Sequence, residues 1–367
     1  MKIKCSRTDL FVAVSGVSRA VSSKTAIPSI EGILIRTFED KIVLTGYDLE
    51  IGITTSVPAA VDSEGEIVIN ARLLLDIIRK SNDDVITIET NERSQVILIC
   101  GIARFEFSGI PATDFPDLPS PDTETALSIA GNEIKEMIER TLFAVAQDNQ
   151  KPVHTGTKFF IENDMLTLVS VDGYRLAVCR KSTESAEEKR FVIPAKTLLE
   201  VSRLIGDSEE EIYISTAKRY AVFSLKGYSV VTRLLEGDFL DYKRAIPEGY
   251  MTRVKIDVNL LFNSVERTSL IITDKFKSPV RLKFENNTVS VSCVTALGNA
   301  YDELNADING NDVEIGFNNR YILDALRHCG VSEVILEINE PTSPMKIVPA
   351  DGSDFLFLVL PVRIKTE

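Results

Sequence analysis

Basic side chains recur at matching places in three similar segments of this sequence. The segments are NARLLLDIIR (70–79), PAKTLLEVSR (194–203) and NNRYILDALR (318–327), and each begins 124 residues after the one before it, since 194 − 70 = 124 and 318 − 194 = 124. The repeated basic residues are Arg72, Arg79, Lys196, Arg203, Arg320 and Arg327, and Lys80 adds one more beside Arg79. Because lysine and arginine bind phosphate and carboxylate groups, these segments could hold a polyanion.

The spacing within each segment predicts an amphipathic helix. Arg72 and Arg79 are seven residues apart, which is two helical turns, so they share one face with Asp76 between them. The opposite side is expected to pack on its own unit through Leu73, Leu74, Ile77 and Ile78. One such helix alone is typical of a solvated charged face. Three equivalent helices favour a binding surface.

The charge balance of the whole chain makes these segments unusual. The chain has 41 basic and 54 acidic residues, a net charge of −13. The three segments together hold six basic residues and three acidic ones, namely Asp76, Glu200 and Asp324. A basic stripe on an acidic protein favours a polyanion that is held at one surface and repelled from the others. Nucleic acid is one such ligand, and contacts to its phosphates alone would not depend on its sequence.

The same period of 124 residues connects further pairs of segments. TDFPD (113–117) matches GDFLD (237–241), and Asp48 in TGYDLEI corresponds to Asp172 in SVDGYRL. A repeated period indicates one structural unit that is present several times in the chain. We therefore expect three tandem domains, with boundaries at the proline-rich stretches: residues 1–122, 123–249 and 250–367.

Each repeat contains the pattern of an α+β domain, with two helices and antiparallel strands. In the second repeat, NEIKEMIERTLFAVAQ has helical spacing. TKFFIEN and MLTLVSV alternate around a turn and predict a hairpin, and RLAVCRKS predicts a third strand. A second helix-like stretch recurs at FVAVSGVSRAV, IKEMIERTLFAV and LLFNSVERTSLI.

Other classes of protein find little support in the sequence. The pattern STAK (Ser215 to Lys218) fits the SxxK motif of serine acyl-enzymes, but its companion motifs are missing and it lies between two strand-like runs, so we expect a polar hairpin turn instead. The two histidines, His154 and His328, have no metal-site spacing, and phosphate-binding glycine loops are absent, so we expect no cofactor. The five scattered cysteines and the lack of a signal or membrane segment predict a cytoplasmic protein with reduced thiols.

Four stretches of the chain resemble a known family. They are KPVHTGTKFFIENDMLTLVSVDGYRLAV (151–178), GDFLDYKRAIP (237–247), SLIITDKFKSPVRL (269–282) and FLVLPVRI (357–364). These residues are similar to those of the bacterial DNA polymerase sliding clamps, the beta subunit of DNA polymerase III. The resemblance runs nearly end to end in the same order, and DGYRLA and LPVRI are its most specific motifs.

The resemblance implies a non-catalytic ring. Two copies of the chain would close as a homodimer of six similar domains around double-stranded DNA, independently of its sequence. The ring would tether the replicative polymerase, act as a processivity factor, and bind a clamp loader and other proteins that carry a clamp-binding peptide. No membrane partner is implied. A scaffold that binds another polyanion, or only proteins, remains the alternative.

The resemblance also assigns roles to individual residues. It adds Lys24 to the DNA-facing basic residues. It places the dimer contact at Arg104, Phe105 and Phe107 against Leu270 and Ile271. It places a peptide-binding pocket at His154, Thr155, Gly156, Val171, Asp172, Gly173, Tyr174, Arg175, Leu176, Leu240, Tyr242, Arg244, Ala245, Asn318, Tyr321, Leu358, Val359, Leu360, Pro361, Val362 and Arg363.

In the pocket, Leu176, Val359, Leu360 and Val362 would bury a partner's leucine or phenylalanine, and Arg175 and Arg244 would meet its polar or acidic flank. The chain departs from the family at His154, Val171 and Leu240, where leucine, threonine and proline are common.

The sequence alone also allows a purely structural role for several of these residues. Gly173 would serve equally as a turn residue that Asp172 caps. The apolar pocket residues Leu176, Leu358, Val359 and Leu360 would serve equally as core strand residues. Phe105 and Phe107 alternate with charged residues as in any half-buried strand.

Overall fold

The computed structural model describes residues 1–22, 25–121, 124–148, 150–183, 188–273, 278–352 and 354–364. Within these ranges the chain forms six α-helices: α1 (Arg7–Val17), α2 (Ala71–Lys80), α3 (Gly131–Leu142), α4 (Ala195–Ile205), α5 (Val258–Thr268) and α6 (Asn319–His328). The remaining regular elements are antiparallel strands and short 3-10 helices. The chain divides into two compact units, Met1–Asn132 with Glu200–Leu234, and Glu133–Leu199 with Leu235–Glu367.

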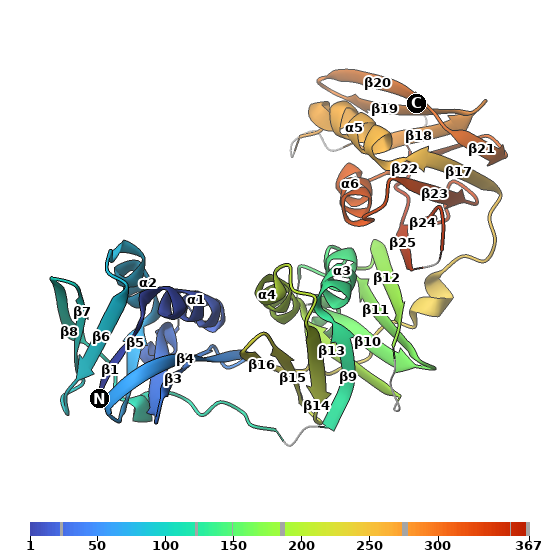
Figure 1. The fold of residues 1–367 in the computed structure, drawn as a ribbon. Coiled ribbons are helices and arrows are strands. Elements are labelled where there is room, and N and C mark those ends of the chain that lie inside the picture. Colours follow the sequence, from blue (N-terminus) through green and yellow to red (C-terminus); the bar gives the residue numbers. More distant parts are fainter. Residues whose placement is uncertain are drawn as a thin grey trace. The chain divides into compact units, whose positions relative to one another are not determined.

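The first unit is built on one twelve-stranded antiparallel sheet. Its main path runs in the order β8-β7-β6-β1-β4-β16-β15-β14-β9, and β2, β3 and β5 join beside it. The strands are β1 (Lys2–Ser6), β2 (Gly32–Phe38), β3 (Lys41–Tyr47), β4 (Ile51–Ser63), β5 (Glu66–Asn70), β6 (Val85–Thr90), β7 (Gln95–Cys100), β8 (Ala103–Ser108), β9 (Glu124–Ala130), β14 (Glu211–Thr216), β15 (Tyr220–Leu225) and β16 (Tyr228–Arg233). Helices α1 and α2 pack side by side, and α1 also lies against β4 (Figure 1).

The second unit contains a nine-stranded and a four-stranded antiparallel sheet. The larger sheet has the order β13-β10-β11-β12-β25-β24-β23-β17-β21, and the smaller one has the order β20-β19-β18-β22. The strands are β10 (Gly156–Glu162), β11 (Met165–Val171), β12 (Arg175–Ser182), β13 (Lys189–Pro194), β17 (Thr252–Asp257), β18 (Val280–Glu285), β19 (Thr288–Thr295), β20 (Gly298–Asn305), β21 (Asp307–Gly310), β22 (Val313–Phe317), β23 (Glu333–Ile338), β24 (Met345–Pro349) and β25 (Phe355–Val359). Helices α5 and α6 pack against each other (Figure 1).

Two of the sheets continue from one sequence repeat into the next. In the first unit, β4 of the first repeat pairs with β16 of the second, with Ile53 opposite Val230. In the second unit, β12 of the second repeat pairs with β25 of the third, with Leu176 opposite Leu358. The central repeat, which the sequence predicts as one domain, therefore contributes strands to both compact units.

The two residues at the turn of the predicted hairpin explain why the chain reverses there. Asn163 and Asp164 connect β10 to β11, and their φ angles of 52° and 57° lie in the left-handed region. Asparagine and aspartate tolerate this conformation better than most residues, and two such residues form the tight turn whose twist suits a β-hairpin. The predicted hairpin and the third strand that follows it are confirmed.

Asp48 and Asp172, which the repeat places in equivalent positions, form the same turn. Asp48 Oδ1 accepts hydrogen bonds from the backbone N–H groups of Glu50 (3.0 Å) and Ile51 (2.8 Å). Asp172 Oδ1 accepts them from Tyr174 (2.9 Å) and Arg175 (3.0 Å). The capping role of Asp172 is therefore confirmed, and the repeat extends to individual hydrogen bonds.

The three predicted basic helices are present as α2, α4 and α6. Asn70 and Asn318 begin two of them, because their side-chain oxygens accept from the backbone N–H groups of Leu73 and Arg320, at 3.0 Å in each case. On α2, the side chains of Leu74, Ile77 and Ile78 are buried, as predicted. The prediction is wrong for Leu73, which is 40% exposed because it follows Arg72 around the helix toward solvent.

Candidate functional site

The predicted nucleic-acid-facing residues lie on one exposed face of each repeated helix. Exposed side chains are those of Arg72, Arg79, Lys80, Lys196, Arg203, Arg320 and Arg327. Lys24, the further predicted residue of this set, lies outside the described residues. The arrangement gives three equivalent basic surfaces, one for each repeat.

The acidic residue of each helix binds the final arginine. Arg79 pairs with Asp76, Arg203 Nη1 lies 2.7 Å from Glu200 Oε1, and Arg327 Nη1 lies 3.3 Å from Asp324 Oδ1. These pairs are three residues apart, so each lies along a single helix face. Where both side chains are exposed, as in Arg79 with Asp76, such a pair contributes at most about 0.5 kcal/mol to stability. Glu200 is buried and also binds Arg19, with Arg19 Nη1 3.1 Å from Glu200 Oε2.

The floor of the predicted peptide pocket is an apolar cluster on one face of the nine-stranded sheet. Val171, Leu176 and Leu358 come from the adjacent strands β11, β12 and β25, and all three are buried. Tyr242, in the short 3-10 helix η5 (Tyr242–Ala245), packs against the same cluster. The structure therefore brings together residues that are far apart in sequence, and they share a face because strand side chains alternate.

Exposed apolar side chains are also found among the predicted pocket residues. They are Tyr174, Leu240, Leu360 and Val362. Two backbone hydrogen bonds fix the segment after β25, from Leu360 N to Tyr174 O (2.9 Å) and from Val362 N to Gly316 O (2.8 Å). Leu360 and Val362 are thus held in place with their side chains accessible to a partner.

Val359 does not offer surface to a ligand in this structure. It is fully buried in the core that also contains Phe357 and Met345. It lies opposite Arg175 in the β12–β25 ladder, on the face away from Leu176 and Leu358. This placement corrects the expectation that its side chain buries a partner's leucine.

Arg175 is engaged within the chain rather than exposed. Its Nε lies 2.9 Å from Asp172 Oδ2 and its Nη1 lies 2.6 Å from Asp324 Oδ2. The guanidinium also lies over the rings of Tyr321 (4.7 Å) and Phe143 (5.5 Å). With 8% of its surface exposed, Arg175 cannot meet a partner's acidic flank, which corrects that prediction.

Arg244, the other predicted flank residue, is accessible. Its side chain is 88% exposed, and its Nε lies 3.1 Å from Asp241 Oδ2. Arg363 is also exposed, whereas Ala245 and Pro361 are half-buried. Of the two arginines proposed to meet a partner, only Arg244 has the exposure that this role needs.

His154 has a different environment from the rest of the pocket residues. Its ring packs edge to face on Phe239 at 5.1 Å, and its Nε2 is buried with no hydrogen-bond partner among the described residues. Burial, with a smaller effect of the Lys151 charge, lowers the pKa of His154. The neutral ring therefore acts as an aromatic packing residue.

The two residues after His154 contribute to the local backbone structure. Thr155 Oγ1 donates to Pro152 O (2.7 Å). Gly156 is buried in the β10–β13 pair, where an added Cβ would come within 2.4 Å of Ile193 O. Glycine is required at residue 156 by this close approach of two strands.

A cleft of about 540 Å³ has the predicted pocket residues Asn318 and Val362 in its lining. It is lined by Ile272, Thr273, Ser278, Pro279, Asn318, Asn319, Arg320 and Val362. Tyr321 follows on α6 and stacks on Tyr174, with ring centroids 6.0 Å apart. The side-chain oxygen of Asn318 is already used as the helix cap, so its amide nitrogen is the group left for a ligand.

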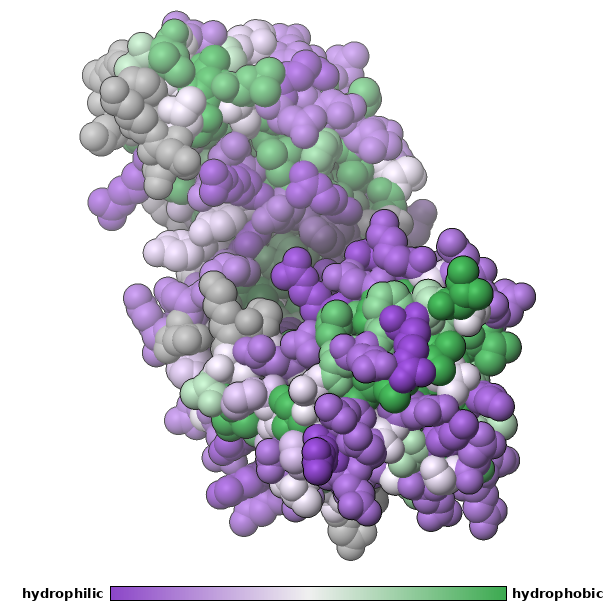
Figure 2. Space-filling view, turned by 90° about the vertical axis from the view of Figure 1, so that its left-hand side faces the viewer, coloured by the Kyte–Doolittle hydropathy of each residue, from purple (hydrophilic) through white to green (hydrophobic). Residues whose placement is uncertain are grey.

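The predicted dimer residues lie at exposed positions of the chain. Strand β8 is the end of its sheet and, in the described part of the chain, pairs with β7 alone. Arg104 and Phe105 of this strand are exposed and Phe107 is half-buried. Figure 2 views the side of the first unit on which β7 and β8 lie, and hydrophobic side chains gather there among hydrophilic ones. Leu270 is 78% exposed and Ile271 is half-buried in the short helix after α5.

Comparisons with known proteins agree over the length of the chain. Residues 1–119, 128–241 and 243–363 match the N-terminal, central and C-terminal domains of the DNA polymerase III beta subunit. The beta sliding clamp of Staphylococcus epidermidis is 31% identical over 97% of this chain and 98% of its own length. This chain belongs to the DNA polymerase III beta subunit family.

Solved structures of sliding clamps share the fold. The Bacillus subtilis clamp has a TM-score of 0.96 at 27% identity, with both chains covered completely. The Pseudomonas aeruginosa beta subunit has a TM-score of 0.94 at 28% identity, covering 99% of this chain and 100% of its own. The sliding clamp fold of three similar domains, with helices packed on antiparallel sheets, is therefore confirmed.

The STAK pattern, which fits the SxxK motif of serine acyl-enzymes, lies at a hairpin in this structure. Ser215 lies near the end of β14, and Lys218 lies in the turn to β15, where Ala217 N donates to Tyr220 O (2.8 Å). The hairpin interpretation of this motif is confirmed. In the part of the chain that the structure covers, no group of three His, Cys, Asp or Glu side chains could hold a metal ion. No described helix is both long and apolar enough to span a membrane.

The sequence did not indicate the contacts that Asp324 makes beyond its own helix. Its place in the repeat, equivalent to Asp76 and Glu200, marks it as an i,i+3 partner of the arginine on its own helix. The second contact, to Arg175 of the central repeat, depends on the β12–β25 pairing. The aromatic residue Phe143, which lies under Arg175, had no signal in the repeat.

Proposed function

We propose that two copies of this chain close into a ring around double-stranded DNA, with α2, α4 and α6 of each copy facing the duplex. The observation that carries this proposal is the same exposed basic face on all three helices of an otherwise acidic chain. Membership of the sliding clamp family supports it. Contacts to phosphates alone would let the ring move along any sequence.

The closing contact would join Arg104, Phe105 and Phe107 of one copy to Leu270 and Ile271 of the other. Support comes from their exposure and from the outer edge of β8, which no described strand pairs with, since a free sheet edge offers backbone hydrogen bonds to a second chain. The contact is heterologous between unlike domains, so two copies suffice for closure. The domains of each copy would be residues 1–122, 123–249 and 250–367.

The ring would tether the replicative polymerase and other proteins through a short peptide. Leu240, Leu360 and Val362 would form the rim that holds its apolar side chains, over a floor that contains Leu176 and Leu358. A few apolar anchors carry most of the affinity in such sites. A clamp loader that opens the ring, a cytoplasmic location and the lack of catalytic activity are parts of the same proposal.

Retention on circular DNA tests the ring. The chain is loaded on nicked circular DNA with a bacterial clamp loader and ATP, and the complex is passed through a sizing column in high salt. Retention is expected to persist, because ring closure does not depend on screened charges, and linearising the DNA is expected to release the protein. Equal loss from circular and linear DNA would contradict a closed ring.

A scaffold that binds another polyanion is the alternative, and the same experiment separates the two. Such a scaffold would bind linear and circular DNA alike, and added heparin would compete for both. A matched control is Arg253→Gln, which removes an exposed basic side chain of β17, outside the repeated helices. This change is expected to leave retention unaltered.

A further inference from the structure

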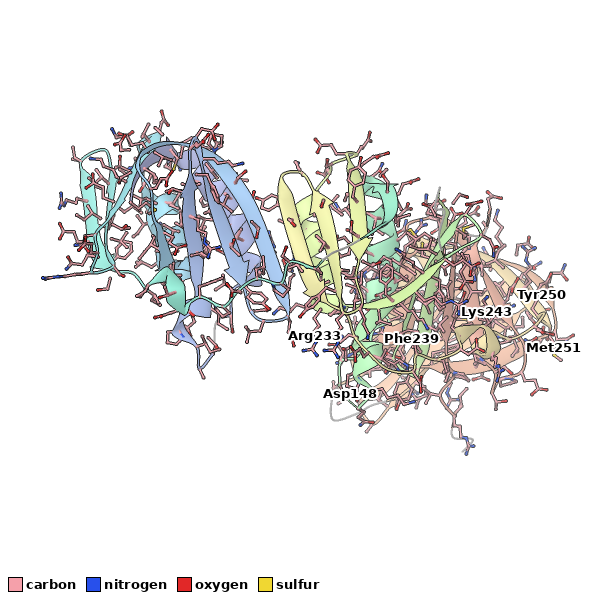
Figure 3. The ribbon with its side chains drawn as sticks, turned by 90° about the horizontal axis from the view of Figure 1, so that it is seen from below. Asp148, Arg233, Phe239, Lys243, Tyr250 and Met251 are labelled. Atoms are coloured by element: carbon pink, nitrogen blue, oxygen red, sulfur yellow. The ribbon has the colours of Figure 1, made fainter. Side chains whose placement is uncertain are left out.

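A second cleft opens on the same face of the nine-stranded sheet as the pocket floor. Its volume is about 310 Å³, and its lining includes Phe160, Met165, Thr167, Arg180, Tyr242 and Lys243. Figure 3 labels Lys243 together with Phe239 on the segment that crosses this side of the second unit. The predicted pocket residues do not include any of this set except Tyr242.

The strand register gives the distance between the cleft and the peptide pocket. Leu176 pairs with Val171 in the pocket floor, and Arg180 pairs with Thr167 in the cleft. Leu176 and Arg180 are four residues apart on one strand, so they point to the same face about 13 Å apart. Tyr242 packs on the pocket cluster and also lines the cleft, so the two sites are continuous.

The cleft carries an excess of positive charge on an acidic protein. Among the described residues, no hydrogen bond or ion pair joins the side chain of Arg180 or Lys243 to another group. Glu162, the carboxylate that lines the cleft, is already bound by Arg190 at 2.6 Å from Nε and 2.5 Å from Nη2. The two cations are therefore available to an anionic ligand.

The aromatic surroundings favour a peptide over a simple ion. Lys158 Nζ lies over the rings of Phe160 (4.8 Å) and Phe239 (5.4 Å), so a third cation contacts the apolar surface next to the cleft. Phe160 and Met165 offer apolar contact to the carbon chains of glutamate or to an aromatic side chain. Basic and apolar groups side by side suit an acidic segment of polypeptide.

We propose that this cleft binds an acidic stretch that flanks the clamp-binding peptide of a partner protein. An extended chain covers about 13 Å in about four residues, which is the distance from the pocket floor to Arg180. The acidic stretch would thus lie within a few residues of the apolar anchors. This inference rests on the proposed peptide pocket and adds to it a preference for acidic partners.

Peptides with different extensions test the proposal. A short labelled peptide containing glutamine, leucine and phenylalanine is compared with versions that carry about four glutamates, or about four glutamines, at either end. Fluorescence anisotropy is expected to show that one glutamate version binds about three- to tenfold more tightly than its glutamine counterpart. The advantage should shrink as salt rises, because the charges are exposed.

Removing the two cations provides the decisive comparison. The double variant Arg180→Gln with Lys243→Gln is expected to lose the advantage of the glutamate extension and to bind the unextended peptide as before. The control variant Lys226→Gln with Arg253→Gln removes the same charge from exposed sites outside the cleft and should keep the advantage. Circular dichroism and thermal unfolding establish that both double variants are folded.

The possible outcomes separate this inference from the proposed function. If the unextended peptide does not bind the unaltered protein, the peptide pocket itself is wrong. If it binds but glutamates add nothing, or if the control loses the advantage equally, the pocket stands and the acidic cleft is wrong. A cleft that instead serves nucleic acid would show weaker single-stranded DNA binding in the Arg180 and Lys243 variant with unchanged peptide affinities, which would also overturn the proposal.

Discussion

The guanidinium of Arg175 binds two carboxylates that are 152 residues apart in sequence, since 324 − 172 = 152. Asp172 Oδ2 lies 2.9 Å from Nε, in the turn that precedes β12, and Asp324 Oδ2 lies 2.6 Å from Nη1, on α6. One side chain thus connects the central repeat to a helix of the third repeat within the second unit. Because the group is buried and fully paired, it favours one fixed packing of α6 against β12.

Replacing Arg175 should test the strength of this connection. The variant Arg175→Met keeps the length of the side chain but leaves Asp172 without its cation and Asp324 with Arg327 alone. Breaking a buried ion pair from one side costs about 3 kcal/mol of unfolding free energy, measured by urea denaturation. The control Arg244→Met removes an exposed arginine and should cost less than about 0.5 kcal/mol. Equal stability of the two variants would show that Arg175 has no such role.

The equivalent turns at Asp48 and Asp172 lead to a second prediction. Leu49 and Gly173 occupy matching positions after these aspartates, with φ angles of 76° and 90°. Leucine is strained at a positive φ, whereas glycine is not. We expect Gly173→Ala to lower the unfolding free energy by about 1 kcal/mol, although an added Cβ at Gly173 meets nothing within 4 Å.

The reverse change in the first repeat is the matched control. Leu49→Gly relieves strain at an exposed side chain, so it should leave stability unchanged or raise it by up to about 1 kcal/mol. Thermal unfolding of both variants measures the two effects. If both changes were equally destabilising, the backbone conformation would not be the reason for glycine at residue 173.

The fold could be predicted from the sequence where local chemistry decides it. The repeat of 124 residues gave the three basic helices, and Asn163 with Asp164 gave the hairpin, because caps and turns depend on neighbouring residues. Which strands pair across the repeats, namely β4 with β16 and β12 with β25, could not be predicted from the residues alone. Those strands come from different repeats, and alternating apolar residues do not specify which edge a strand will meet.

The candidate site shows the same difference between features that neighbouring residues decide and features that depend on strand pairing between repeats. The exposed basic side chains of the three helices could be predicted from the repeat of 124 residues and from their charge. The roles of Arg175 and Val359 do not, because both depend on the face that each residue takes in the β12–β25 ladder. A shift of one residue in that ladder would exchange Val359 with Leu358 between pocket floor and core. Residue type alone therefore could not assign them.

The thiol of Cys5 gives a prediction about pH. Burial, with a smaller effect of Asp9, raises the pKa of Cys5 to about 12 from its ordinary 9.0. In the unfolded chain this thiol loses its proton as the pH passes 9, while the folded protein keeps it protonated until about pH 12. The stability that Cys5 contributes is thus complete below pH 9 and falls between pH 9 and pH 12.

Urea unfolding of the unaltered protein and of Cys5→Ala measures this effect. By about pH 10.5 the unaltered protein should have lost about 2 kcal/mol more than the variant, relative to about pH 8. The variant serves as the control for all other groups that titrate in this range. A constant difference between the two proteins across the pH range would show that Cys5 titrates in the folded state as it does in the unfolded chain.

The last prediction concerns closure of the ring. Leu270 is 78% exposed in the single chain and Ile271 is half-buried, so their contribution to the fold of the monomer is small. If both pack on Phe105 and Phe107 of a second copy, replacing each by alanine removes about 2 kcal/mol of association energy, or about a 30-fold weakening. Sedimentation velocity over a range of concentrations should then show folded monomers of Leu270→Ala with Ile271→Ala where the unaltered protein is dimeric. The control Met251→Ala changes another exposed apolar side chain, labelled in Figure 3, and should stay dimeric. A double variant that remains dimeric at low concentration would place the interface elsewhere on the chain, and the free edge of β8 would then need another partner.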